Sequence, residues 1–482
     1  MMEIEDSLLS RLKKYGETDV YPFHMPGHKR RLWAQEWGNP IAMDITEIDG
    51  FDNLHAPEGI LKESMERAAH FYGSEKSYYL VNGSTCGILS AICACTSHGG
   101  HIILGRNCHK SAYNGIFLNG LHASYVYPQW IAEYGMDGGY LLSDVQAAVE
   151  KDPLSKAVLL VSPTYEGVVS DIGAIAGWLH ERGILLIVDE AHGAHFPFGE
   201  EGQFPKSALK MGADVVIQSL HKTLPSPTQT AILHVQGTLV DRERLERYLH
   251  IYQSSSPSYI LMAGIDRCVR GMMEEGRELM KAYGESLSKL RERLSGLNHI
   301  RVPGRGELGA GVYDLDPSKL VLSVLGTDIS GRMLMEELRQ RYHLELEMSA
   351  PTYALAMTTV ADTAEGMERL WEALAQIDGR IGPGSGTLDL SFCQRKIRLK
   401  QSCTMAEALE GRWESVSWAD SVGRTAAETV FVYPPGIPIV VPGEVISEAV
   451  IEAVEMYEKQ GFPVQGLSDE SRRRIRVMGN GG

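Results

Sequence analysis

The chain has 482 residues, of which 44% are apolar and 22% charged, and its formal net charge at pH 7 is -16. This composition is typical of a globular protein and excludes a disordered or fibrous one. The length predicts two or three lobes rather than one simple core. The acidic balance argues against a nucleic acid as the main partner, because a phosphate-binding surface needs a basic excess.

The first residues, Met1-Met2-Glu3-Ile4-Glu5-Asp6, have neither the basic nor the apolar region of a signal peptide. No apolar run approaches the roughly 18 residues that span a membrane. Seven cysteines are scattered along the chain at positions 86, 93, 95, 108, 268, 393 and 403, and none of them form pairs at zinc spacing. We therefore predict a cytoplasmic protein with reduced thiols, no metal site and no membrane partner.

Apolar runs that resemble buried strands alternate with helical patterns between about residues 75 and 235. The predicted strands are 77–81, 101–104, 157–162, 184–189 and 214–219, and the predicted helices include 84–96 and 172–182. Repeated strand-helix-strand units with nearly continuous apolar strands predict a mostly parallel sheet that is covered by helices on both faces. The predicted fold class is therefore α/β.

The rest of the chain predicts further lobes. Residues 238–300 have a helical pattern that is interrupted at Ser254-Ser255-Ser256-Pro257, and residues 379–386 form the clearest linker. We expect an amino-terminal arm over residues 1–50, a large domain over 51–300, a small α/β domain over 301–378 and a carboxy-terminal domain over 387–482. The parts that follow the large domain are expected to be smaller α+β lobes.

Polar clusters follow four of the predicted strands, and ligands of open α/β sheets bind beyond the carboxyl ends of the strands. The first cluster, Asn82-Gly83-Ser84-Thr85-Cys86-Gly87, opens an apolar helix and is a candidate anion site, although Ser84 is equally well explained as a helix cap. The second, Asp189-Glu190-Ala191-His192, places a carboxylate where it needs a cationic partner. Its letters also occur in helicases, but the chain lacks the accompanying phosphate-binding loop.

The other two clusters are Arg106-Asn107-Cys108-His109-Lys110-Ser111 and Ser219-Leu220-His221-Lys222. His109 either stacks on a heteroaromatic ring or bonds to the backbone of its loop. Lys222 is either a surface residue or a nucleophile toward a carbonyl group, with a pKa lowered by burial and with assistance from His221. Taken together, an anion cradle, a stacking ring, an acid 33 residues before a lysine (222 minus 189) and that lysine at a strand end are the parts that hold pyridoxal phosphate.

The order of these motifs resembles that of the bacterial ornithine/lysine/arginine decarboxylase family. Besides the four clusters, the resemblance rests on His24-Met25-Pro26-Gly27-His28-Lys29, Leu54-His55-Ala56-Pro57-Glu58-Gly59, Tyr433-Pro434-Pro435-Gly436-Ile437-Pro438 and Pro442-Gly443-Glu444. It extends from about residue 20 to about residue 450. The larger enzymes of the family carry an amino-terminal response-regulator-like domain, and since the core motifs begin here by residue 24, the chain resembles a short form without it.

The resemblance implies the aspartate aminotransferase type of fold (fold type I), a homodimer or larger dimer-based oligomer, and pyridoxal 5'-phosphate as the cofactor. Lys222 would bind the cofactor covalently, and Asp189 would pair with its pyridine nitrogen. His109 and Ala191 would contact opposite faces of its ring. The implied phosphate and remaining cofactor contacts are Ser84, Thr85, Cys86, His192, Ser219, His221 and, from the neighbouring subunit, Ser255, whose serine run is equally well explained as a helix break.

The implied reaction is decarboxylation of a basic L-amino acid (lysine, arginine or ornithine) to a polyamine or a polyamine precursor. The predicted catalytic residues are Lys222, His221, Asp189 and His109, with Lys222 or His221 returning a proton to the α carbon. Glu347, or an acid within 433–444, is a candidate partner for the distal cation of the substrate, and a solvated surface charge is the other explanation.

Two other functions remain open at this point. The same fold supports aminotransferases, aldolases and β-lyases, because the cofactor alone does not select which bond of the α carbon breaks. A noncatalytic regulatory protein that retains the fold is the second alternative.

Overall fold

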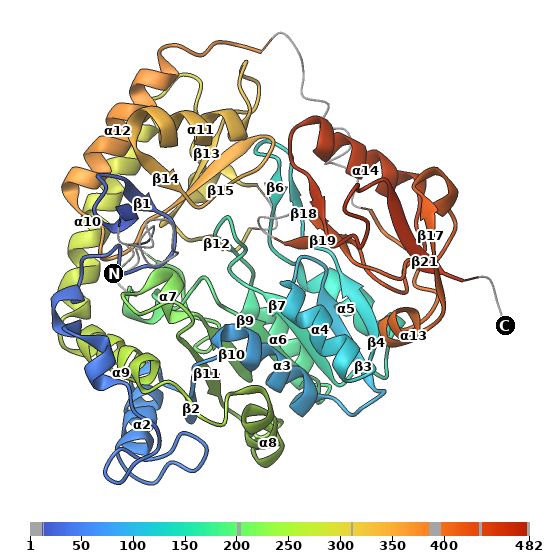
Figure 1. Cartoon of the computed structure of the whole chain (residues 1–482), viewed down its shortest axis with the longest axis horizontal. Helices are drawn as coiled ribbons and strands as arrows, with labels where there is room; N and C mark the ends of the chain where they lie inside the picture. The colour runs from blue at the N-terminus through green and yellow to red at the C-terminus, as the bar shows by residue number, and fades with distance from the viewer. Residues whose placement is uncertain are drawn as a thin grey trace, which may run out of the picture.

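The computed structural model describes residue 12 and residues 14–199, 204–309, 312–384, 397–432 and 436–479. A seven-stranded sheet with the order β2-β11-β10-β9-β7-β3-β4 forms its centre (Figure 1). The strands are β2 (Lys76–Leu80), β3 (His101–Gly105), β4 (His122–Val126), β7 (Ala157–Val161), β9 (Leu185–Asp189), β10 (Val215–Gln218) and β11 (Ala231–Val235). The five strands predicted from the sequence coincide with β2, β3, β7, β9 and β10 to within one residue at each end, whereas β4 and β11 were not predicted.

The strand directions explain where the predicted site residues meet. From β10 to β4 all neighbouring strands are parallel, and β11 runs antiparallel to both β10 and β2. Every residue of β9 is buried, as expected for a parallel strand that is covered on both faces. The loops after β3, β9 and β10 therefore lie along one edge of the sheet.

Helices cover both faces of the sheet, because alternate strand residues point to opposite sides. Ile187 and Ile217 belong to one apolar cluster, whereas Val188 and Val216 belong to another. The helices of the first cluster are α3 (Gly83–Cys95), α4 (Lys110–Leu118) and α8 (Arg242–Tyr252). Those of the second are α2 (Ile60–Tyr72), α5 (Leu142–Lys151), α6 (Ile172–His180), α9 (Tyr259–Glu274) and α10 (Gly276–Leu294). The predicted mostly parallel α/β sheet is confirmed.

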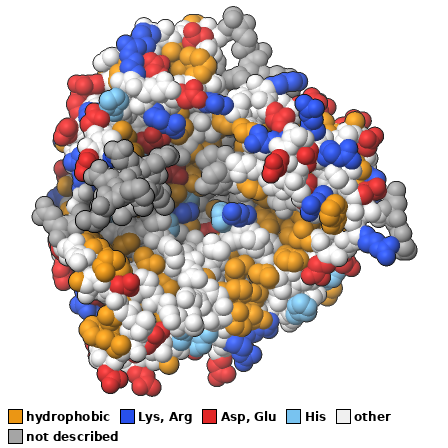
Figure 2. Space-filling view, viewed as in Figure 1, with side chains coloured by type: hydrophobic (Ala, Val, Ile, Leu, Met, Phe, Trp, Pro, Cys, Tyr) orange, Lys and Arg blue, Asp and Glu red, His pale blue; other side chains and the backbone are white. Residues whose placement is uncertain are grey.

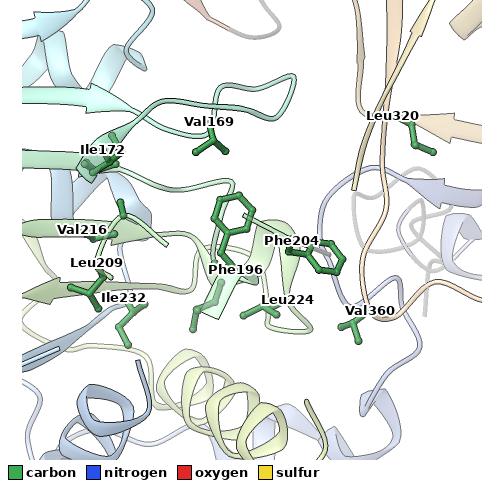
Figure 3. Packing of buried hydrophobic residues seen from close by; sticks show 14 of the residues in the cluster. Val169, Ile172, Phe196, Phe204, Leu209, Val216, Leu224, Ile232, Leu320 and Val360 are labelled. Atoms are coloured by element: carbon green, nitrogen blue, oxygen red, sulfur yellow. The ribbon is translucent and has the colours of Figure 1, made fainter. Parts of the chain in front are cut away.

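A smaller antiparallel sheet, with the order β13-β16-β15, packs beside the large one. Its strands are β13 (Lys319–Ser323), β15 (Met348–Ser349) and β16 (Tyr353–Met357). The same part of the chain contains α11 (Gly331–Tyr342), β14 (Leu344–Leu346) and α12 (Ala364–Asp378). The amino-terminal strand β1 (Tyr21–Phe23) pairs in parallel with β14. Figure 3 shows Phe196 and Leu224 between Val216 of the large sheet and Val360 after β16, so one apolar core joins the two sheets.

Short elements connect these layers. They are η1 (Ala34–Trp37), η2 (Pro40–Met43), β5 (Trp130–Ile131), β6 (Met136–Asp137), β8 (Val168–Val169), η3 (Phe196–Phe198), α7 (Leu220–Thr223), η4 (Arg305–Glu307) and β12 (Asp314–Leu315). Among the described residues, no helix is both long and apolar enough to cross a membrane.

The carboxy-terminal lobe has its own apolar core and two small sheets. Its elements are α13 (Met405–Glu410), β17 (Trp413–Ser417), η5 (Ala419–Ser421), β18 (Val430–Val432), β19 (Ile437–Val440), α14 (Glu448–Lys459), β20 (Val464–Gln465) and β21 (Arg474–Met478). The predicted linker is described only as far as residue 384, and Cys393 and Tyr433–Pro435 lie outside the described residues. The predicted domain boundaries stay predictions.

A buried ion pair ties this lobe to the large sheet. Arg106 directly follows β3, and its guanidinium donates to the carboxylate of Glu444 at 3.1 Å and to the carbonyl oxygens of Pro438 and Ile439 at 2.9 and 3.3 Å. Arg106 is 7% exposed and Glu444 is 1% exposed. The carboxy-terminal lobe therefore holds the first residue of the loop that carries His109.

Replacing Glu444 with Gln should destabilise the protein, because it leaves the buried guanidinium of Arg106 without a counter-charge. We expect a loss of about 3 kcal/mol in the free energy of unfolding. For a chain of this size the midpoint of thermal unfolding should then fall by about 3 °C. Glu448→Gln, which changes an exposed glutamate four residues along, is the control; equal midpoints for the two variants would contradict a structural role for the ion pair.

Candidate active site

Lys222 lies in the short helix α7, directly after β10. Its Nζ is 3.0 Å from Nε2 of His192, and its side chain is within reach of the face of Tyr165. Burial lowers the pKa of Lys222, while the negative charges of Asp189 and Glu347 act in the opposite direction. Figure 2 shows a hollow in this view of the molecule with basic and histidine side chains at its floor. A lysine in this environment is far more nucleophilic than one in water.

Asp189 is the last residue of β9, one strand away from Lys222, and is 5% exposed. Its Oδ1 accepts the backbone N–H of Ala191 at 3.1 Å, and Ala191 is itself buried. Burial raises the pKa of Asp189, and the charge of Lys222 lowers it. A carboxylate in such a place requires a cationic partner, and the protonated nitrogen of a pyridine ring meets that requirement.

His109 is the N-cap residue of α4, and its Nδ1 accepts the backbone N–H of Ser111 at 3.3 Å. A bond from His109 to the backbone of its loop was one of the two alternatives that the sequence allowed. Because Nδ1 accepts in this bond, the proton of the neutral ring is on Nε2. The side chain is nevertheless exposed in the single chain. Its predicted stacking on a cofactor ring therefore stays a prediction.

The loop between β2 and α3 has the features of an anion site. Gly83 has a φ of 71°, a left-handed conformation that favours glycine, and the N-cap residue is Asn82 rather than Ser84. Ser84 is therefore not the helix cap, which was the alternative explanation for this residue. Ser84 is half-buried, Thr85 is exposed and Cys86 is buried, so backbone N–H groups and two hydroxyls are presented at a helix N-terminus.

Ser219 supplies a direct test of whether an anion fits. It is fully buried, and its hydroxyl has no hydrogen-bond partner among the described residues. A buried hydroxyl without a partner is costly, and an oxygen of a bound phosphate would satisfy it. The next side chain, His221, bonds through Nδ1 to the carbonyl oxygen of Thr230 at 2.9 Å, and burial lowers its pKa to about 4. The residues at this edge of the sheet fit a phosphorylated pyridine cofactor.

Ser255 is exposed in the loop after α8. Two residues before it, the side-chain oxygen of Gln253 accepts the backbone N–H of Val81 at 2.9 Å. The serine run is therefore anchored beside the strand that leads into the Asn82–Cys86 loop. The predicted contact of Ser255 with the phosphate of a neighbouring subunit stays a prediction.

The sequence did not single out Tyr165 and Lys319. The ring of Tyr165 packs 4.3 Å from the ring of His192, and its hydroxyl donates to Glu347 at 3.0 Å. Nζ of Lys319 lies 3.4 Å from Nδ1 of His192. Lys319 directly precedes the apolar run Leu320-Val321-Leu322. A lysine at the start of a buried strand is the sequence feature that could have identified Lys319 as a candidate site residue. Nothing local marks Tyr165.

A buried lysine, a buried acid and a candidate anion site at the carboxyl edge of a mostly parallel sheet are features of pyridoxal phosphate enzymes of fold type I. The lysine decarboxylase of Francisella novicida has a similar structure, with a TM-score of 0.77 at 20% identity, over 98% of this chain and 81% of that one. An alanine-glyoxylate aminotransferase from Nostoc gives a TM-score of 0.53 at 14% identity, over 66% of this chain and 86% of that one. The predicted fold type is confirmed.

The chain belongs to the Orn/Lys/Arg decarboxylase family. The family's major domain matches residues 7–304 and its C-terminal domain matches residues 391–471. The chain is also 32% identical to the arginine decarboxylase of Bacillus subtilis, over 99% of each chain. Membership confirms the predicted class of activity, decarboxylation of a basic amino acid, and implies dependence on pyridoxal phosphate.

Replacing Ser219 with Ala should weaken anion binding without destabilising the fold, because it removes a hydroxyl that lacks a partner. We expect the affinity of the cofactor-free, full-length chain for inorganic phosphate to fall about tenfold, the value of one good hydrogen bond. Isothermal titration calorimetry measures this directly. Ser90→Ala is a matched control, since Ser90 is also buried and without a partner among the described residues, but lies within α3. Equal affinities in the two variants would remove Ser219 from the site.

Proposed function

We propose that this protein is a pyridoxal phosphate-dependent arginine decarboxylase that works as a homodimer. The observation that carries the proposal is the position of Lys222 just after β10, beside Asp189 at the end of the neighbouring strand. The choice of arginine is supported by two relatives, from Bacillus subtilis and Bacillus anthracis, that are named arginine decarboxylase and match this chain over nearly their whole lengths. Lysine and ornithine are the other substrates that the family name allows.

Pyridoxal phosphate, when bound, supplies an electron-withdrawing ring that accepts the electron pair left when carbon dioxide departs. Asp189 would keep a proton on the pyridine nitrogen by placing a negative charge beside it. Lys222 would hold the cofactor through its neutral amine and would be the group that returns a proton to the α carbon. His109 and Ala191 would contact the ring, and the Ser84–Cys86 turn with Ser219 would bind the phosphate.

Glu347 is the residue that we propose to bind the distal cation of the substrate. Its two carboxylate oxygens accept from the backbone N–H of Met25 at 2.9 Å and from the hydroxyl of Tyr165 at 3.0 Å. These partners fix the carboxylate without neutralising it. Glu347 is also one of the two negative charges that raise the pKa of Lys222, so its charge is felt at the site of the proposed reaction.

Exposed apolar side chains support the homodimer. Ile41, Ile48, Phe51 and Ile60 are 47% to 77% exposed and lie in one stretch of the amino-terminal region. An apolar surface of this kind marks a protein interface. The same stretch contacts the Ser254–Ser256 loop, since Nε2 of His55 bonds to the carbonyl oxygen of Ser254 at 2.7 Å. The cytoplasmic location stays a prediction.

Replacing Lys222 with Ala should abolish both activity and the yellow, borohydride-reducible cofactor adduct, because no other residue is proposed to attach the aldehyde. The measurement is the release of labelled carbon dioxide from carboxyl-labelled arginine, lysine and ornithine in parallel, with absorbance spectra of the same samples. Lys151→Ala, an exposed lysine in α5, is the control. Retention of the adduct in the Lys222 variant would remove Lys222 from its role.

The same assay separates the proposed reaction from its alternatives. Turnover of arginine without carbon dioxide release would indicate an aminotransferase, aldolase or β-lyase. No turnover of any of the three amino acids would support a noncatalytic protein.

Replacing Glu347 with Gln should weaken discrimination between a charged and a neutral side chain. The wild-type protein should prefer arginine to citrulline, its neutral isostere, and the variant should lose about tenfold to a hundredfold of that preference, mainly through a higher KM for arginine. Glu345→Gln is the control, because Glu345 instead pairs with Arg339 at 2.9 Å. An unchanged preference in the Glu347 variant would assign the distal cation to another acid.

A further inference from the structure

A second lysine lies on the opposite side of an imidazole from Lys222. Lys319, the first residue of β13, is 1% exposed, and its Nζ lies 3.4 Å from Nδ1 of His192. Nε2 of the same ring lies 3.0 Å from Nζ of Lys222. His192 therefore bridges two lysine amines that come from different sheets.

The bonding capacity of the ring restricts the charges of the two lysines. Burial lowers the pKa of His192 well below its ordinary value, and the neighbouring lysines lower it further, so the ring is neutral. A neutral imidazole has one N–H donor and one acceptor nitrogen, whereas an ammonium group only donates. Only one of the two lysines can therefore be an ammonium bonded to the ring. The other accepts the ring N–H and is a neutral amine.

The surroundings indicate which lysine carries the charge. Lys319 follows Asp316, a fully buried acid that raises the pKa of this lysine, although burial still holds the value at about 8. Lys319 is therefore mostly an ammonium at neutral pH and donates to Nδ1. The ring then carries its proton on Nε2 and donates it to Lys222.

We propose that Lys319 is a positioning residue that acts through His192 to hold Lys222 as a neutral amine and to supply it with a proton. This inference rests on the proposed role of Lys222. The transfer balances without another reactant. The ammonium of Lys319 gives a proton to Nδ1, the ring releases its Nε2 proton to Lys222, and the total charge of the three groups is unchanged. The reverse transfer restores the starting state.

The neighbouring loop is shaped to hold this arrangement. Gly167 has a φ of 97°, and a Cβ at this position would lie 2.8 Å from Cγ of Lys319, so a larger residue would displace the lysine stem. Two residues earlier, the ring of Tyr165 packs against His192. One short loop therefore fixes both the lysine stem and the imidazole.

The other charged groups near the two lysines have partners of their own. Lys29 donates to the carbonyl oxygens of His24 and Met357 at 3.1 and 2.8 Å and lies 4.0 Å from Asp362. Asp316 is 3.3 Å from Nε2 of His195. The remaining titratable groups that face Lys222 or His192 are Asp189, His109, His221, Glu347 and Tyr165, whose hydroxyl donates to Glu347. Glu347 raises the pKa of both lysines, and the charge of Lys222 lowers the pKa of Lys319. The hydrogen-bonded route between the lysines passes through His192, and substitutions at His192 separate it from these charge effects.

The test measures the basicity of Lys222 in the full-length, cofactor-free protein. Competitive acetylation with trace acetic anhydride, followed by mass spectrometry of the peptide that contains Lys222, gives its reactivity as a function of pH. The Lys319→Met substitution removes a cation, so the ammonium form of Lys222 becomes more stable. The labelling of Lys222 at neutral pH should therefore fall about tenfold, and the midpoint of its reactivity profile should move to higher pH. Lys319→Arg should retain most of the wild-type profile, and Lys151→Met all of it.

Two changes at His192 separate the proposed bonding from a general effect of packing. Gln keeps one donor and one acceptor, so His192→Gln should retain a profile close to wild type. Phe keeps the bulk and loses both groups, so His192→Phe should behave like Lys319→Met. This pair also decides the matter if Lys319→Met fails to fold. Wild-type profiles in Lys319→Met and His192→Phe, or equal loss in His192→Gln and His192→Phe, would overturn the proposal.

A second readout uses the holoenzyme. Loss of the Lys319 charge should raise the pH at which the visible absorption band of the bound cofactor titrates. The labelling result does not depend on decarboxylation, so it stands if no amino acid releases carbon dioxide. Conversely, if the protein decarboxylates an amino acid and the labelling of Lys222 is unchanged in Lys319→Met and His192→Phe, only the role of Lys319 is overturned.

Discussion

The cost of burying lysine amines at the carboxyl edge of the large sheet is the constraint on which the site depends. An ammonium that is removed from water is unstable unless it is paired or loses its proton. Lys29 is paired, with two carbonyl oxygens and Asp362 around it. Lys222 has no such cage among the described residues, and its Nζ instead lies 3.0 Å from Nε2 of His192. Burial lowers the pKa of both lysines, so it is their partners that differ. The difference between these two lysines separates a structural cation from a reactive amine.

The architecture that maintains this desolvation comes from three parts of the chain. The large sheet supplies Asp189 and Lys222 at the ends of adjacent strands, and the small sheet supplies Lys319 at the start of β13. The carboxy-terminal lobe fixes the His109 loop through Arg106, whose guanidinium donates to Pro438, Ile439 and Glu444 of that lobe. No single lobe of this chain contains the whole candidate site.

The sequence was sufficient for the sheet, its direction and the residues at its edge, because each of these depends on local patterns. The strand bounds follow from apolar runs, and Asp189 and Lys222 are polar residues at the points where such runs stop. It was not sufficient for contacts between segments distant along the chain. The bridge from Lys222 through His192 to Lys319 joins three such segments, and the partners of Glu347 are Met25 and Tyr165. These contacts depend on how the two sheets pack, which no local pattern encodes.

Tyr165 connects the two ends of the proposed site, since its hydroxyl bonds to Glu347 and its ring packs on His192. Glu347 raises the pKa of Lys222 by its negative charge. A guanidinium or ammonium bound at Glu347 would cancel that charge, and the pKa of Lys222 would fall further. A basic substrate would thereby favour the neutral form of the amine that it must displace, whereas a neutral amino acid would not. In this arrangement the cationic side chain contributes to reactivity as well as to binding, so selection for basic amino acids follows from the electrostatics of the lysine itself.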